Sequence, residues 1–466
     1  MKEVLSVKKH SQSMLQGPLL LNIISYTVPI ILTSLLQLLF NAADLVVVGR
    51  FCGSISVAAV GATGSITALI VNLFIGLSVG AGVTMAHALG ARENDTVHKT
   101  VHTALPASLI CGGVVTVVGV LLSESLLRLM GTPEDVLPLS AVYMKIYFGG
   151  ITFTMVYNFC SSILRAVGDT KSPLIFLSIS GVINVVLNLI FVTQFHMNVA
   201  GVALATVTSQ GVSAVMVVIV LMRRTDASKL VLSKMKIYMP QLQKMIRIGL
   251  PAGIQSSLFS ISNVMIQSSI NSFGGVLMSG NAASQNIEGF VYVALNSFHQ
   301  TAVNFIGQNV GAHQYDRVKK ILITCLGCVT VVGVTMGTLV YSMGETLLSI
   351  YITDSAEAIS YGMLRLSCVC LPYFLCGLMD VSTGALRGMG SSVAPMIISV
   401  LGVCGIRIGW ILTVFQIPRF HTPQCLYISY PITWTVTFLI QMIAFSRIYK
   451  QHSKMLHVQS NIMDRE

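Results

Sequence analysis

The chain has 466 residues, of which 54% are apolar and only 10% are Asp, Glu, Lys or Arg. An ordinary soluble domain carries about 25% charged residues, so this composition excludes a soluble enzyme, a disordered chain and a nucleic-acid-binding protein. The formal net charge of +11 therefore needs another explanation than a polyanionic partner.

Apolar runs long enough to cross a membrane recur along the whole chain and predict an all-α polytopic membrane protein with twelve transmembrane helices. We place spans near residues 24–48, 59–84, 102–122, 139–164, 174–193, 199–222, 248–272, 281–306, 320–341, 361–386, 395–415 and 425–446. The expected parts are a cytoplasmic tail (1–17), an N-lobe (18–222), a basic linker (223–247), a C-lobe (248–447) and a second cytoplasmic tail (448–466).

The distribution of positive charge predicts the orientation of these spans. Most of the 28 Lys and Arg residues fall in the two tails, in the linker and in the loops on the same side of the membrane. Because Lys and Arg in short loops stay in the cytoplasm, both termini are expected there. This asymmetry accounts for the net positive charge. The linker itself suits an anionic membrane surface.

The two predicted halves repeat each other. Arg387 follows Arg165 by 222 residues within similar segments, and Pro251 follows Pro29 by the same distance. A constant offset over separate segments indicates duplication. Since each half has an even number of spans, both copies enter the membrane the same way round. We expect two six-helix parallel repeats around a central cleft, which suits a transporter that works by alternating access.

A group of polar residues in the first half is a candidate cation or proton site. Asp44 lies within the first span, where a charge is costly and therefore usually functional. Asn184 and Asn188 share one face of the fifth span, and Thr206 and Thr208 lie on the sixth. One carboxylate with neutral oxygens suits a hard cation or a proton. The alternative is that these amides and hydroxyls only join helices.

Pro29 precedes Asp44 by 15 residues in the first span. A proline removes one backbone hydrogen bond and lets a helix bend, so Pro29 is a candidate hinge. The alternative is that Pro29 merely opens the span, as Pro251 would in the second half.

The second half supplies candidate residues for a substrate cavity. Glu288 and Asp380 are its two carboxylates within spans, and Arg407 needs a partner that either of them could supply. The alternative is that Arg407 lies at a helix end and pairs there structurally. Tyr292, with Phe290, Phe298 and Phe305, adds aromatic rings to the acidic lining, a combination that suits organic cations. A lipid-facing aromatic stripe is the alternative.

Two further patterns carry little chemistry. His98 and His102 lie one helical turn apart, but without a third ligand they indicate an interfacial pair better than a metal site. Most of the ten cysteines sit inside apolar runs, where cysteine behaves as a small hydrophobic residue. We expect no metal site and no disulfide framework.

With these residues in view, the chain resembles the multidrug and toxic compound extrusion (MATE) family, prokaryotic type. The resemblance covers about residues 18–450 and rests on the duplicated twelve spans, the basic linker and three motifs. These are Asp44 with the following Val46-Val47-Val48-Gly49, Gly307-Gln308 followed by Gly311-Ala312, and Leu386-Arg387-Gly388.

The resemblance implies a cation or proton site formed by Asp44, Asn184, Asn188 and Thr206. The second asparagine position is often an aspartate in the family, so this chain carries one charge fewer there. Some members also carry acidic residues on spans 7, 8 and 10; here span 7 has none, and Glu288 and Asp380 supply the other two.

The function implied by this family is a cation- or proton-coupled antiporter that exports small, often cationic, amphipathic compounds. It would work as a monomer in the plasma membrane without a cofactor, driven by Na⁺ or H⁺. Three alternatives remain: a major-facilitator-type transporter, a lipid or lipid-linked glycan flippase of the same superfamily, and a membrane-embedded enzyme. The inner loop GARENDTVHK lacks the loop motif of major-facilitator-type transporters. The acidic residues Asp44, Glu288 and Asp380 do not suit the basic cavity of a glycan flippase.

Overall fold

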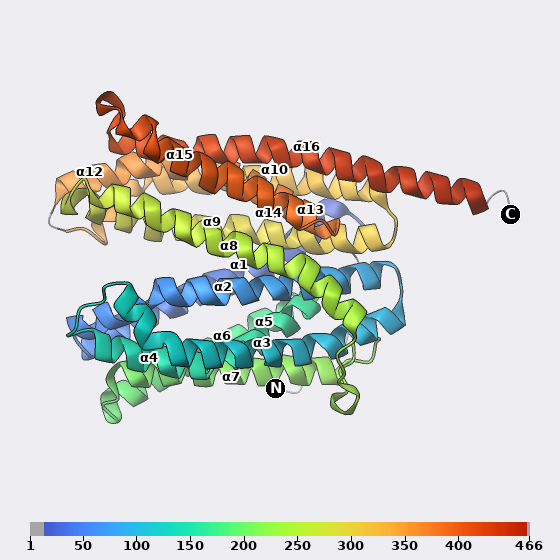
Figure 1. Cartoon of the computed structure of the whole chain (residues 1–466), viewed down its shortest axis with the longest axis horizontal. Helices are drawn as coiled ribbons and strands as arrows, with labels where there is room; N and C mark the ends of the chain where they lie inside the picture. The colour runs from blue at the N-terminus through green and yellow to red at the C-terminus, as the bar shows by residue number, and fades with distance from the viewer. Residues whose placement is uncertain (1–13, 354, 464–466) are drawn as a thin grey trace. The chain divides into compact units, whose positions relative to one another are not determined.

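The computed structural model describes residues 14–353 and 355–463, and within them every regular element is a helix (Figure 1). The first half contains α1 (Leu19–Phe51), α2 (Ser54–Gly90), α3 (Asn94–Leu129), α4 (Leu137–Gly149), α5 (Ile151–Ala166), α6 (Lys171–Leu189) with η1 (Ile190–Gln194), and α7 (Asn198–Arg223). Most of the predicted N-terminal tail, residues 1–13, lies outside the described residues, as do residues 464–466 of the C-terminal one.

The linker holds one short helix, η2 (Leu232–Lys234), and the second half follows the order of the first. It contains α8 (Met239–Asn271), α9 (Gly275–Gly311), α10 (Tyr315–Ser342), α11 (Gly344–Ser349), α12 (Ala356–Arg365) with η3 (Leu366–Cys370), α13 (Tyr373–Gly388), α14 (Val393–Ser399) with η4 (Val400–Gly405), α15 (Ile406–Leu412), η5 (Val414–Gln416), η6 (Pro418–Phe420) and α16 (Pro423–Met463).

A helical segment covers each of the twelve predicted spans. Eight segments in the described chain are long and apolar enough to cross a membrane alone. Two more qualify as bent pairs, α4 with α5 (45°) and α12–η3 with α13 (41°). The remaining two, α8 and α9, have 33 and 37 residues but more Ser, Asn and Gln. The prediction of an all-α polytopic membrane protein is confirmed.

The duplication also appears in the structure. α2 and α9 have 37 residues each, and each follows a glycine with positive φ, Gly53 (φ 86°) and Gly274 (φ 96°). α5 and α13 have 16 residues each and both follow a bend. The left-handed residue after α2, Arg92 (φ 58°), has its counterpart in His313 (φ 57°) after α9. Element lengths and turn geometry therefore repeat at the offset that the sequence indicated.

The described chain forms two compact units, and their limits fall inside helices. The N-terminal unit comprises residues 28–257, and the C-terminal unit comprises residues 14–27 and 258–463. The first turns of α1 thus group with the C-terminal unit, and the first half of α8 groups with the N-terminal unit. In the N-terminal unit α3 packs against α2, α4 and α5; in the C-terminal unit α9 packs against α10, α12 and α13 (Figure 1).

Glycines hold the first half of α8 against α2 inside the N-terminal unit. Gly76 and Gly80 on α2 face Gly249 and Gly253 on α8, and a Cβ on any of the four would overlap backbone of the other helix. This small-xxx-small spacing on both helices lets the two backbones touch. Pro251 lies between Gly249 and Gly253 in the sequence and is therefore within this contact region.

Hydroxyls and aromatic rings hold the first turns of α1 inside the C-terminal unit. The hydroxyls of Thr27 and Thr301 on α9 are 2.8 Å apart, and the ring of Tyr26 meets Phe305 edge to face at 5.2 Å. Phe305 is fully buried in this contact.

Candidate functional site

The N-terminal unit brings together the four residues of the predicted cation or proton site. The amide of Asn188 donates to Oδ1 of Asp44, and the hydroxyl of Thr206 donates to Oδ2 at 3.4 Å. The amide of Asn184 donates to Oγ1 of Thr206, also at 3.4 Å, and that of Asn188 reaches Oδ1 of Asn184 at the same distance. Three helices, α1, α6 and α7, thus contribute to one polar group.

A close approach of α1 and α6 explains why these residues meet. A Cβ at Gly181 would overlap the ring of Phe40, so only glycine lets the two helices come so near. Asp44 lies one turn beyond Phe40, and Asn188 lies two turns beyond Gly181. Because whole helical turns separate these residues, the faces of α1 and α6 that meet at Gly181 also bring the Asp44 carboxylate and the Asn188 amide together.

One buried oxygen atom of this polar group accepts no hydrogen bond in the described chain. Asn188 is fully buried and Asn184 is 4% exposed, yet Oδ1 of Asn188 has no hydrogen-bond partner in the described chain. Buried polar groups are almost always paired, so an unpaired carbonyl oxygen beside a carboxylate marks a place for a cation or a proton donor. No cluster of three or more His, Cys, Asp or Glu side chains occurs in the described ranges. The oxygen set suits a small hard cation.

Two other observations concern the neighbours of Asp44. Tyr143 on α4, which the sequence did not single out, interacts electrostatically with Asp44. Thr208 is exposed and bonds only to its own helix, at the carbonyl of Leu204. Of the two threonines on this helix, only Thr206 reaches the site.

Pro29 lies inside α1, ten residues after its first residue, and Pro251 lies inside α8 in the same way. The alternative that these prolines open their helices is therefore wrong. The Thr33 hydroxyl donates to the carbonyl of Pro29 at 2.6 Å. Pro29 also lies next to residue 28, where α1 passes from one compact unit to the other.

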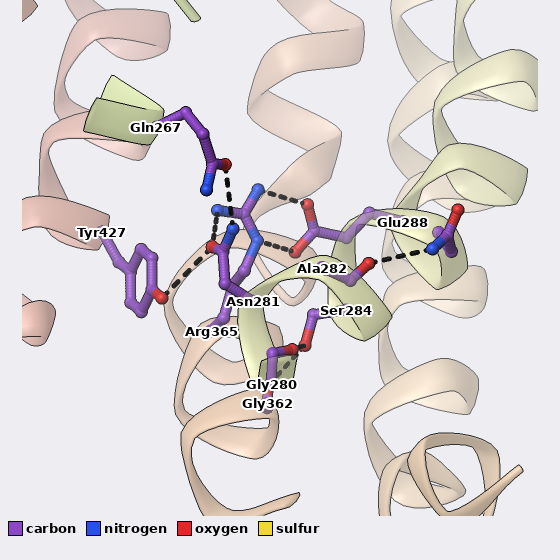
Figure 2. A network of polar contacts seen from close by, with 10 residues as sticks. Gln267, Gly280, Asn281, Ala282, Ser284, Glu288, Gly362, Arg365 and Tyr427 are labelled. Carbon is purple, nitrogen blue, oxygen red and sulfur yellow. Dashed lines mark hydrogen bonds and ion pairs between the residues drawn. The ribbon is translucent and has the colours of Figure 1, made fainter. Parts of the chain in front are cut away.

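In the C-terminal unit Glu288 forms a buried ion pair with Arg365 (Figure 2). Nε of Arg365 donates to Oε1 at 3.0 Å and Nη2 donates to Oε2 at 2.8 Å, while Nη1 donates to Oδ1 of Asn281 at 2.8 Å. Tyr427 donates to the same Asn281 oxygen at 3.2 Å. Glu288 is therefore neutralised by a bidentate partner.

Sequence reasoning missed Arg365 as this partner. Arg365 belongs to α12 and is only 3% exposed. The signal that could have found it is its position within an apolar run, where an arginine requires a carboxylate. Of the two alternatives for Arg407, a carboxylate partner is not found, because no ion pair in the described ranges includes Arg407.

Asp380 occupies a separate polar group with α9. Its carboxylate interacts with the side chain of Asn296, and its Oδ2 is buried without a hydrogen-bond partner in the described part of the chain. His299 binds the backbone carbonyl of Asp380 through Nδ1 at 2.7 Å, and Arg387 approaches Nε2 of His299 at 3.3 Å. Tyr292, 40% exposed, accepts a hydrogen bond from Asn296.

The predicted histidine pair joins the linker to α3. The rings of His98 and His102 stack at 3.9 Å, and Nε2 of His102 accepts the backbone N–H of Val231 at 3.1 Å. Thr103 accepts the N–H of Tyr238 in the same manner. This pair therefore helps to hold the linker on the N-terminal unit.

Comparisons with known proteins agree with this architecture. The family model described as MatE matches residues 29–190 and 251–411, one copy in each half. The "Probable multidrug resistance protein YoeA" of Bacillus subtilis is 26% identical over 424 residues, covering 89% of this chain and 91% of that protein. The "Probable multidrug resistance protein YpnP" of the same species is 27% identical over 397 residues, covering 84% and 87%.

A solved structure shares the fold as well. The crystal structure of a MATE protein in complex with MaL6 has a TM-score of 0.87 and 20% sequence identity, and the match covers 95% of this chain and 98% of that one. The family model spans more than half of the chain and both of its repeats. The protein therefore belongs to the MatE family of membrane transporters and is not an enzyme.

Proposed function

We propose that this protein is a cation- or proton-coupled antiporter that exports small, amphipathic, often cationic organic compounds. The observation that carries the proposal is the polar group around Asp44, with its unpaired Asn188 carbonyl oxygen. The names of the relatives, multidrug resistance proteins, support an export role. Membership of the MatE family sets aside the major-facilitator-type and enzyme alternatives.

The site supports coupling through one acidic switch. A Na⁺ ion or a proton that reaches Asp44 from outside would neutralise its charge and draw α1, α6 and α7 together through their shared contacts. This would favour a conformation with lower affinity for the exported compound, which leaves outward while the ion leaves inward. One charge crossing 100 mV yields about 2.3 kcal/mol, enough for a gradient of more than tenfold.

The rest of the arrangement belongs to the same proposal. The protein works as a monomer in the plasma membrane, with both termini in the cytoplasm. Its N-lobe (18–222) and C-lobe (248–447) carry out alternating access. Pro29 serves as the hinge of α1. Glu288, Tyr292, Asp380 and Arg407 contribute to substrate recognition in the C-terminal unit, with Asp380 the acid that has no basic partner at bonding distance in the described ranges.

A resistance assay in cells tests the proposal with matched variants. Asp44→Asn should abolish export of a cationic dye, whereas Asp95→Asn, which alters an exposed carboxylate, should leave export unchanged. Thr206→Ala should weaken export several-fold, while Thr208→Ala, an exposed hydroxyl on the same helix, should have no effect. Full export by Asp44→Asn at equal membrane abundance would refute the proposal.

A further inference from the structure

The linker is fixed on the N-terminal unit at two points. The backbone N–H of Val231 donates to Nε2 of His102 at 3.1 Å, and that of Tyr238 donates to Oγ1 of Thr103 at 3.1 Å. Just before the first bond, Leu230 is 1% exposed and belongs to the apolar core of this unit. The six residues between the two bonds therefore have a defined position against α3.

Lysine side chains gather where this segment meets the beginning of α3. Nζ of Lys236 from the linker and Nζ of Lys99 from α3 each lie 5.9 Å from the centre of the Tyr238 ring. Lys234 is close enough to act electrostatically on His98. We refer to Lys99, Lys234 and Lys236 as the lysine cluster.

The chain supplies little negative charge to balance this cluster. The linker contains seven basic residues and one acid, which is paired within the linker itself. Asp95 forms an ion pair with Lys99, and its side chain is 76% exposed. Lys234 and Lys236 are exposed and form no ion pair in residues 14–353 and 355–463. Because like charges held near one another repel, an anion that binds between them is favoured.

Exposed apolar side chains alternate with these lysines. Leu232, Met235 and Met239 are 44%, 38% and 62% exposed. Two candidate membrane spans border the cluster, since α7 ends at Arg223 where the linker begins and α3 begins at Asn94. The cluster therefore lies near the level of the lipid headgroups, where lysines meet phosphates and apolar side chains reach the acyl chains.

We propose that the lysine cluster, with Tyr238, Met235 and Met239, is a binding site for the headgroup of an anionic phospholipid. The ammonium groups of Lys234 and Lys236 bind the lipid phosphate, and the two methionines contact the acyl chains. The apolar side chains favour a lipid over a free anion. Because α3 and the linker build this site, whereas α1, α6 and α7 build the proposed ion site, the inference goes beyond the proposed function.

Native mass spectrometry of the purified full-length protein tests the site. The protein in detergent is titrated with phosphatidylglycerol or with phosphatidylcholine of the same acyl chains, and bound lipid is counted at each concentration. The test variant is Lys234→Gln with Lys236→Gln. Its matched control is Lys319→Gln with Lys320→Gln, which removes the same charge from two exposed lysines at the start of α10.

The wild type should bind phosphatidylglycerol about twentyfold more tightly than phosphatidylcholine, because each lysine near an anionic headgroup contributes about fivefold. The test variant should bring the two affinities within about twofold of each other, and the control should keep the wild-type preference. Lys234→Arg with Lys236→Arg should also keep it, since arginine binds phosphate as well. Asp95→Asn should increase the preference, because it releases Lys99 from its ion pair.

Three results would overturn the site. The first is a wild type that binds phosphatidylglycerol no better than phosphatidylcholine. The second is an equal loss in the test variant and its control, as a general attraction between basic surfaces and anionic lipid would give. The third is full displacement of phosphatidylglycerol by inorganic phosphate, which would assign the lysines to a free anion.

Discussion

Asn188 donates its amide to the carboxylate of Asp44 and keeps its own carbonyl oxygen unpaired, although the residue is fully buried. An asparagine in this position supplies an oxygen ligand without adding a second charge. The site therefore holds one negative charge, which a single Na⁺ ion or proton neutralises.

Converting Asn188 to aspartate tests this charge balance. Asn188→Asp adds a second carboxylate beside Asp44, so the mutual repulsion of the two anions should increase affinity for a cation. In a Na⁺-binding assay on the purified protein we expect half-saturation at a concentration at least about threefold lower. Asn286→Asp, which alters an exposed asparagine on α9, is the matched control. An unchanged midpoint would argue against a cation at this position.

The pair of Glu288 and Arg365 should matter for stability. Glu288→Gln leaves the charge of Arg365 uncompensated, which costs about 3–5 kcal/mol at a buried pair. The thermal midpoint in detergent should therefore fall by several degrees, and the double variant Glu288→Met with Arg365→Met should recover most of the loss. Glu357→Gln, an exposed glutamate in α12, should be neutral. A neutral Glu288→Gln would show that the ion pair contributes nothing to the fold.

Asp226 in the linker predicts a pH dependence. Burial alone would raise the pKa of this carboxyl, but hydrogen bonds from Arg224 and Ser228 outweigh burial and hold its pKa below the usual value. Such a group stabilises the fold above the ordinary aspartate pKa and loses that contribution as the pH falls through the lowered one. Protection of the linker should be constant from pH 8 to about pH 5 and should decline progressively below about pH 4.

Hydrogen exchange at the Ser228 amide measures this directly, because that N–H donates to Asp226 at 3.0 Å. Asp226→Asn should exchange faster at neutral pH and show little further change on acidification. Asp135→Asn, at an exposed carboxylate outside the linker, should exchange like the wild type. A linker that loosens in the wild type between pH 7 and pH 5 would contradict the assignment to Asp226.

The glycine contact between α2 and α8 predicts a position-specific cost. Gly80→Ala places a Cβ against the backbone oxygen of Met245, so α8 has to move and the thermal midpoint should fall. Gly64→Ala on the same helix meets nothing within 4 Å, and alanine improves helix propensity by about 1 kcal/mol, so this control should be neutral or stabilising. Equal effects of the two substitutions would show that the close approach is unimportant.

The sequence predicted the residues around Asp44 because the helical period and the rarity of charge both apply within single spans. Asn184 and Asn188 had to share a face, and a carboxylate in a span had to have polar neighbours. Periodicity does not say which helix a face meets, so the sequence could not pair Glu288 with Arg365, 77 residues away. The sequence also could not show that the compact units meet inside α1 and α8. A continuous helical pattern does not reveal that the two ends of one helix pack in different units.

Counterflow in liposomes tests whether an ion gradient drives export through Asp44. Purified wild type and Asp44→Asn are reconstituted, an organic cation is loaded inside, and Na⁺ and H⁺ gradients are imposed separately. We expect wild-type transport to follow one of the two gradients and Asp44→Asn to respond to neither. Transport that ignores both gradients, or an Asp44→Asn variant that follows them like the wild type, would contradict it.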